Sequence, residues 1–194
     1  MKTENIEKNY ATAKARYAEL GIDTDKAIAT LEKTPISLHC WQADDVTGFE
    51  SNAALTGGIQ ATGNYPGKAR NIDELRADIE KVQSLLAGTY RLNLHETYGE
   101  FGGKFVDRDQ VDASYFQGWI EWAKEHNLKL DFNSTSFSHP KSGILSLANP
   151  DKSIRDFWIE HTKRCRDIAN EMGKAQDDPC IMNLWVHDGC KDVS

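Results

Sequence analysis

His95 is the residue around which the possible chemistry of this chain is arranged. It ends the run Tyr90–His95, in which Leu92 and Leu94 alternate with Asn93 and His95. Successive side chains of a strand point to opposite faces, so one face of this run is apolar and the other is polar. An imidazole titrates near neutral pH and can donate or accept a proton. The run therefore predicts a buried strand with an acid–base group at its carboxyl end.

Three further runs show the same alternation, namely Ile36–Trp41, Lys129–Asn133 and Ile181–His187. One set of alternate positions in them is apolar, and the other set is polar or aromatic: Ser37, His39 and Trp41; Asp131 and Asn133; Asn183, Trp185 and His187. Four strands of this kind predict a sheet that curls around a polar interior and is covered by helices outside. The fold class expected is α/β, as the first four β/α units of a (β/α)8 barrel of the TIM type.

Helices are predicted where apolar residues recur at steps of three and four. These segments are Ile6–Leu20, a short helix through Ile28 and Leu31 capped by Asp23 or Thr24, Leu75–Leu86 after the capping pair Asn71 and Glu74, Phe116–Ala123, and Ile154–Met172, which Asp151 caps and Gly173 stops. Their alternation with the strands predicts parallel pairing. Residues 1–35 are expected to form a helical extension and residues 36–194 the barrel units.

The segment between the first strand and its helix, residues 42–70, is long and rich in glycine. Loops of this length inside compact domains are commonly lids or binding loops, but a solvated insertion has the same sequence signature. Both interpretations stay open. The part Gly63–Ala69 is not a phosphate-binding loop, because its glycine spacing is one residue short and Ala69 stands where a Ser or Thr is needed.

Four side chains are expected at the rim formed by the carboxyl ends of the strands, where barrel enzymes place their active sites. They are Trp41, His95, Phe137 and Trp185. Aromatic rings beside a histidine suit a sugar, since the rings cover its C–H face while the imidazole exchanges a proton with an oxygen. The alternative is that inward Trp and His side chains only fill the barrel. His161 lies on an apolar helix stripe and is expected to be a core histidine.

Charge and cysteine content narrow the class of partners and the compartment. The formal net charge of −7 argues against nucleic acid and anionic membranes, which require concentrated Lys and Arg. The four cysteines show no metal-binding spacing, and the charged amino terminus has no apolar signal core. A cytoplasmic protein without disulfides is expected.

Several longer motifs resemble the bacterial L-rhamnose isomerases. They are His39–Glu50 (HCWQADDVTGFE), Leu55–Arg70 (LTGGIQATGNYPGKAR), Arg91–His95 (RLNLH), Leu130–Asn133 (LDFN), and Asn183–Trp185 with Asp188 and Gly189. The resemblance covers essentially the whole chain and places it in the wider group of xylose-isomerase-like barrels. It implies an enzyme that interconverts L-rhamnose and L-rhamnulose in the cytoplasm as a homotetramer, using divalent metal ions such as Mn²⁺. It also implies that residues 48–70 cover the site.

The resemblance further implies roles for individual residues. His95 would transfer a proton at the ring oxygen during ring opening, while Trp41, Phe137 and Trp185 would contact the sugar. Phe137 is assigned through Thr135–Pro140, which is similar to a run in xylose isomerases, and His139 is then a structural neighbour.

The metal ligands of the family come from later strands, so none is expected before Ser194. The alternative function is therefore a catalytically silent sugar-binding or assembly fragment, and a metal-dependent nuclease is disfavoured by the acidic charge. The outer residues of the last strand, Met182, Leu184 and Val186, are expected to lack a partner within residues 1–194.

Overall fold

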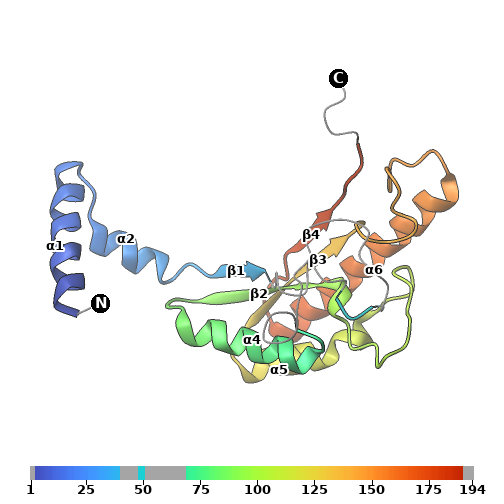
Figure 1. The fold of residues 1–194 in the computed structure, drawn as a ribbon, viewed down its shortest axis with the longest axis horizontal. Helices are drawn as coiled ribbons and strands as arrows, with labels where there is room; N and C mark the ends of the chain where they lie inside the picture. Colours follow the sequence, from blue (N-terminus) through green and yellow to red (C-terminus); the bar gives the residue numbers. More distant parts are fainter. Residues whose placement is uncertain (1–2, 40–47, 51–68, 190–194) are drawn as a thin grey trace. The chain divides into compact units, whose positions relative to one another are not determined.

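The computed structural model describes residues 3–39, 48–50 and 69–189. Its centre is a four-stranded sheet whose strands follow the chain order: β1 (Ile36–His39), β2 (Tyr90–His95), β3 (Lys129–Thr135) and β4 (Met182–Trp185). β2 pairs parallel with β3, and β3 pairs parallel with β4 (Figure 1). The predicted α/β arrangement with parallel strands is confirmed for this half of a barrel.

The boundaries of β3 and β4 differ from the predicted ones. β2 has the predicted bounds, and β3 continues two residues further, to Thr135. β4 is shorter than predicted and ends at Trp185. The Trp185 carbonyl accepts from the Ser136 N–H (3.0 Å), just beyond the end of β3, so the ladder between the two strands stops there. The end of the predicted first strand, including Trp41, lies outside the described residues.

Among the residues that the structure describes, the strands are connected by α4 (Ile72–Leu85), α5 (Gln117–Glu125) and α6 (Lys152–Gln176). The 3-10 turns η1 (Glu96–Tyr98) and η2 (Ala113–Phe116) lie between β2 and α5. The predicted caps are present, since the Asn71 carboxamide accepts from Glu74 N–H and the Asp151 carboxylate from Ser153 N–H, at 2.9 and 2.8 Å. α6 ends at Gln176, near the stop predicted around Gly173, and its C-cap residue Asp177 has a left-handed φ of 48°.

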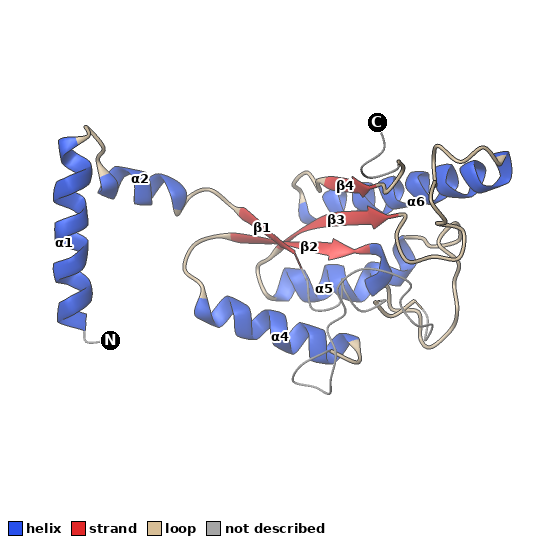
Figure 2. Ribbon diagram, turned by 45° about the horizontal axis from the view of Figure 1, so that its top comes forward, coloured by secondary structure: helices blue, strands red, loops and turns tan. Residues whose placement is uncertain are grey.

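The apolar face of the sheet packs against these helices (Figure 2). Leu94 and Phe132 are fully buried there. The helices contribute the following buried residues: Leu75 from α4; Trp119, Trp122 and Ala123 from α5; and Cys165, Ile168, Ala169 and Met172 from α6. The predicted stripes of α5 and α6 thus enter the core, whereas in the stripe predicted for α4 Leu75 is buried and Val82 and Leu86 are exposed.

The opposite face of the sheet is concave and polar. Ser37 Oγ donates to Asp131 at 2.7 Å, and the Asn133 amide nitrogen lies 3.0 Å from His39 Nδ1, so two pairs of side chains from β1 and β3 meet across β2. Strands two places apart in a flat sheet are about 9–10 Å apart. Short contacts between their side chains therefore show that the sheet curls toward its polar face, as in half a barrel.

A separate compact unit contains residues 1–36 and 86–89, while residues 37–85 and 90–194 form the other. The first unit holds α1 (Thr3–Glu19) and α2 (Thr24–Leu31), and neither helix has a buried residue. Tyr10 donates to Asp25 at 2.5 Å, and Asp23 caps α2 as predicted. The apolar stripe predicted for the first helix exists but is largely exposed, with Leu20 at 75%.

The outer side of β4 is only partly uncovered. Leu184 and Val186 are 44% and 39% exposed, as expected for residues without a covering helix. The prediction is wrong for Met182, because this side chain packs against the core that α6 helps to form. No helix in the described ranges has the length and apolarity required to cross a membrane.

We expect Asp131→Asn to destabilise the sheet strongly. Asp131 is buried and accepts two hydrogen bonds from Arg91, each 2.9 Å, and one from Ile181 N–H. Burial alone would raise the pKa of Asp131, but the hydrogen bonds from Arg91, Ser37 and Ile181 lower it below its usual value. Removing one partner of a buried pair typically costs about 3–5 kcal/mol.

The measurement is the free energy of urea unfolding against pH. A lowered pKa means that the stabilisation is present above the ordinary carboxyl pKa and lost as the pH falls through the folded-state value. Wild type and variant should therefore differ at pH 7 and converge in acid. Asp167→Asn, at an exposed side chain, is the control with a change below about 0.5 kcal/mol. Equal stability at pH 7 would contradict the assignment.

Candidate functional site

His95 ends β2 on the polar face of the sheet and is 5% exposed. The strand register aligns it with Asn133 of β3, which is aligned in turn with Asn183 of β4. The three side chains therefore form one row across the concave face at its carboxyl end. This placement agrees with the predicted parity of the strands.

The turn that follows β2 packs around the imidazole. Because η1 begins directly at Glu96, its residues fold back beside His95 instead of extending the strand. His95 Nδ1 lies 2.9 Å from Glu96 Oε2 and 3.3 Å from Thr97 Oγ1, and the rings of His95 and Tyr98 are 5.5 Å apart. The histidine is thus held in a buried and partly charged environment.

Glu96 is a buried carboxylate, with 1% of its side chain exposed. Its Oε1 lies 3.6 Å from Arg108 Nη1 and 4.0 Å from His161 Nε2. Neither carboxylate oxygen receives an aligned hydrogen bond from the described part of the chain, so the interactions are those of close charges. Burial would raise the pKa of Glu96, but the charges of His95, Arg108 and His161 lower it.

Arg108 is 2% exposed and joins three parts of the chain. Its guanidinium donates to both carboxylate oxygens of Glu50 (2.9 and 2.6 Å) and to the backbone carbonyls of Thr135 and Phe137 (3.0 and 2.7 Å). Burial works against its charge, yet the carboxylates of Glu50 and Glu96 raise the pKa of Arg108 above its ordinary value. The side chain is therefore a buried cation between two acids.

His161 lies on α6 behind this group and is 1% exposed, which confirms the prediction of a core histidine. Its Nδ1 is 3.1 Å from the Arg108 carbonyl oxygen, which can only accept, so Nδ1 carries the proton. Burial lowers the pKa of His161. The interaction with Glu96 opposes this shift, and Arg108 is the neighbour of Glu96 that is always charged.

A short part of the long loop is fixed against η1. Phe49 N–H donates to the Thr97 carbonyl at 2.6 Å, and Glu50 pairs with Arg108. Gly48 has a φ of 55°, and a Cβ at this position would clash with Thr97, so glycine is required there. The other positions between 42 and 68 lie outside the described residues.

The aromatic residues expected at the site occupy different surroundings. The Trp185 ring is 6.1 Å from that of His39 in an edge-on arrangement, and the Phe137 ring is 5.1 Å from that of His187. Phe137 is 44% exposed, and Trp41 lies outside the described residues. Trp185 and Phe137 thus lie at the same carboxyl rim as His95, and Arg108 connects the Phe137 backbone to Glu96.

His139 belongs to an aromatic cluster. Its ring stacks on Phe157 at 5.0 Å, and its Nε2 lies 3.0 Å from Asp107. Nδ1 accepts from the Lys141 N–H, so Nε2 carries the proton and donates to the carboxylate. Burial lowers the pKa of His139. His139 is thus close to Phe137 in the sequence, but its side chain packs against α6.

Comparison with known proteins identifies the family. Residues 4–194 match the family described as RhaA, L-rhamnose isomerase. The chain is 71% identical over 194 residues to an L-rhamnose isomerase of Bacteroides thetaiotaomicron, covering all of this chain and 46% of that protein. The chain belongs to the L-rhamnose isomerase family.

Other L-rhamnose isomerases show the same coverage. The enzymes of Rhodopirellula baltica and Mannheimia succiniciproducens are both 52% identical, over 97% and 96% of this chain and 44% and 45% of their own lengths. The chain therefore spans about half the length of the curated relatives it matches.

The described residues do not form a metal site of their own. Within ranges 3–39, 48–50 and 69–189, no group of three or more His, Cys, Asp or Glu side chains is arranged to hold a metal ion. Glu96 and His95 lie close together, but the third charged neighbour is the cation Arg108. The described residues offer a buried imidazole beside a carboxylate, an arrangement that suits proton transfer.

Sequence reasoning missed Glu96, Arg108 and Glu50 as parts of the site. Glu96 carried a usable signal, because an acid directly follows the histidine at the end of a buried strand. Arg108 lies between Asp107 and Asp109 in a loop, which is typical of a solvated surface. Its partner Glu50 is 58 residues away, so only the folded chain identifies the pair.

We expect Arg108→Met to destabilise the fold by about 3–5 kcal/mol, because it leaves the buried Glu96 and the partly buried Glu50 without their counter-charge. The midpoint of urea unfolding at pH 7 measures the change. Arg166→Met, at a side chain that is 69% exposed, is the matched control and should shift stability by less than about 0.5 kcal/mol. Similar midpoints for the two variants would contradict a central role for the buried guanidinium.

Proposed function

We propose that this protein interconverts L-rhamnose and L-rhamnulose as an aldose–ketose isomerase. The observation that carries the proposal is 71% identity, along the whole chain, to a protein named L-rhamnose isomerase. The buried His95–Glu96 pair at the carboxyl rim supports it, since isomerisation of a cyclic sugar begins with proton transfer that opens the ring. The substrate class is therefore a small neutral sugar, with no nucleic acid or membrane partner.

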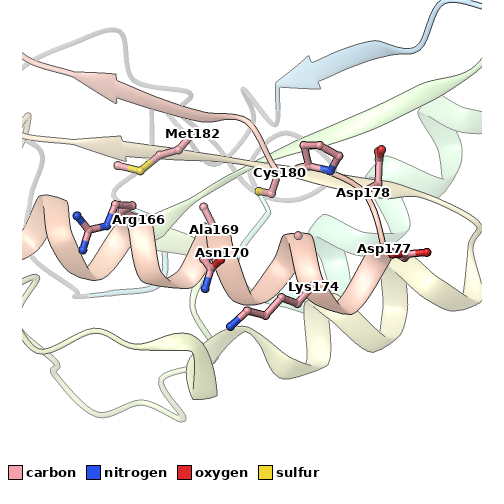
Figure 3. Close-up of a pocket in the computed structure, with 10 residues that line it drawn as sticks. Arg166, Ala169, Asn170, Lys174, Asp177, Asp178, Cys180 and Met182 are labelled. Carbon is pink, nitrogen blue, oxygen red and sulfur yellow. The ribbon is translucent and has the colours of Figure 1, made fainter.

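In this proposal, residues 36–194 form the amino-terminal half of a (β/α)8 barrel. Residues 1–35 form a helical extension, and residues 42–70 form a covering loop. The curled parallel sheet supports this reading. So does a groove of about 610 Å³ that is lined by Cys180 and Met182 and by residues of α6, with Ala169 pointing toward Cys180 (Figure 3). In a barrel, the next β/α unit packs at this position.

The metal and the assembly are proposed from the family. A divalent ion, Mn²⁺ in the first instance, would polarise the sugar oxygens, with ligands from the half of the family's length that this chain does not span. A cytoplasmic homotetramer is proposed, and the exposed apolar side chains of α1 and α2, such as Ile6 and Leu31, are available for contacts between subunits.

Roles are proposed for four residues. His95 assists ring opening by proton transfer, and Trp41, Phe137 and Trp185 contact the apolar side of the sugar together with His95. The location of Phe137 and Trp185 at the rim of the sheet supports this assignment. The runner-up is a catalytically silent sugar-binding or assembly fragment, favoured by the fact that the chain spans 46% of its relative.

The first test compares residues 1–194 with the complete coding sequence that contains them. The complete protein should bind Mn²⁺ and convert L-rhamnose to a ketose, with activity abolished by chelation and restored by Mn²⁺. Residues 1–194 alone should self-associate in light scattering and show no isomerisation. A complete protein that binds the metal but leaves L-rhamnose unchanged would overturn the proposed function, and an active 194-residue monomer would overturn the half-barrel assignment.

His95→Ala in the complete protein should lower kcat for the cyclic sugar by about 10²–10⁴-fold, the usual contribution of a general acid–base group. Its metal content, measured by atomic emission, should stay that of the wild type because His95 is not proposed as a ligand. His126→Ala provides a control histidine that packs on Trp122 of α5. Wild-type turnover, or loss of the metal, would refute the assigned role of His95.

A further inference from the structure

Glu96 lies between His95 and Arg108, and the proposed reaction gives it no role. Its Oε2 is 2.9 Å from His95 Nδ1, and its Oε1 is 3.6 Å from Arg108 Nη1. The Glu96 side chain is 1% exposed, and burying a charged carboxylate is costly unless the charge is paired. Its position therefore requires an explanation.

The proton of the neutral His95 ring can be assigned from this contact. The negative charge of Glu96 favours the tautomer whose N–H lies nearest to it, and that nitrogen is Nδ1, 2.9 Å from Oε2. Thr97 Oγ1, 3.3 Å from the same nitrogen, can also accept. Nδ1 is then protonated, which leaves Nε2 as the nitrogen that is free of a proton.

The charge of Glu96 is maintained by Arg108. The guanidinium does not lose its proton in proteins. It cannot move away from Glu96, because Glu50 and the carbonyls of Thr135 and Phe137 hold it from three other directions. His161, the remaining titratable neighbour, donates its Nδ1–H to the Arg108 carbonyl instead.

We propose that Glu96 is a positioning residue for His95, fixing its proton on Nδ1, and that Arg108 keeps Glu96 in place and charged. The inference rests on the proposed ring-opening role of His95. Nε2 accepts the proton of the anomeric hydroxyl, the bond between the anomeric carbon and the ring oxygen breaks, and Nε2 returns the proton to that oxygen. Glu96 stabilises the imidazolium that exists between the two transfers.

The first measurement determines which nitrogen of the neutral His95 ring carries the proton. Long-range ¹H–¹⁵N spectra of the complete protein with ¹⁵N-labelled histidine distinguish Nδ1–H from Nε2–H, and the signal that disappears in His95→Gln is that of His95. The expected result is Nδ1–H for the neutral ring of His95, shifting to mixed tautomers in Glu96→Gln. A neutral His95 that carries its proton on Nε2 would overturn the proposal without reference to activity.

The second measurement is a double-mutant cycle in the complete protein. Glu96→Gln should lower kcat by about 10–100-fold, as for other groups that orient a functional histidine, and change KM by less than about threefold. In a His95→Gln background the same change should cost less than about threefold, because its effect passes through His95. Glu80→Gln, which removes a carboxylate 3.2 Å from His126, is the matched control and should leave kcat unchanged.

The outcomes separate this inference from the proposed function. Normal turnover in His95→Gln would refute the ring-opening role itself. A slow His95→Gln with a normal Glu96→Gln would refute only the positioning role, as would additive losses in the double variant. If Glu96→Gln does not fold, Glu96→Asp keeps the charge but shortens its reach, and should lower kcat without changing metal content; unchanged kcat in that variant would count against the proposal.

Discussion

The burial of one guanidinium between two carboxylates is the interaction on which the candidate site depends. Arg108 has a side chain that is 2% exposed, and it joins Glu50 of the long loop, Glu96 behind His95 and the backbone that follows β3. Without it, the buried carboxylate of Glu96 would lose its permanent counter-charge, and Glu50 would lose its hydrogen-bond partner. The position of His95 and the path of the chain around the rim are therefore set by the same charge.

The polar face of the sheet carries a second buried ion pair at its other end, between Arg91 and Asp131. Between the two pairs lie Asn93 and Asn133, whose Oδ1 atoms have no hydrogen-bond partner within the described ranges of the chain. Buried polar atoms normally have hydrogen-bond partners, so we expect these amide oxygens to bind water or other polar groups on the concave face of the sheet. This pattern fits a polar barrel interior better than a face packed against apolar residues.

Family membership and the structure give complementary information. The match to L-rhamnose isomerases covers the chain but only about half of each relative, for example 46% of the Bacteroides thetaiotaomicron protein. The structure shows what the matched half contains: a curled wall of four strands, with a histidine held among buried charges at its carboxyl end.

The sequence by itself determined the elements and the faces of the strands. Alternation over four to seven residues and helical spacing are local properties, so Leu94 and Asn93 could be assigned to opposite faces, and Asp151 to a helix cap, without knowledge of the fold. The position of His95 at the end of β2 followed from the same parity. The shortened β4 and the packing of Met182 depend on neighbouring strands and helices, and were not readable. The tertiary structure alone decided the charge network, because Glu50 and Arg108 meet across 58 residues and no local pattern distinguishes a buried arginine from a solvated one.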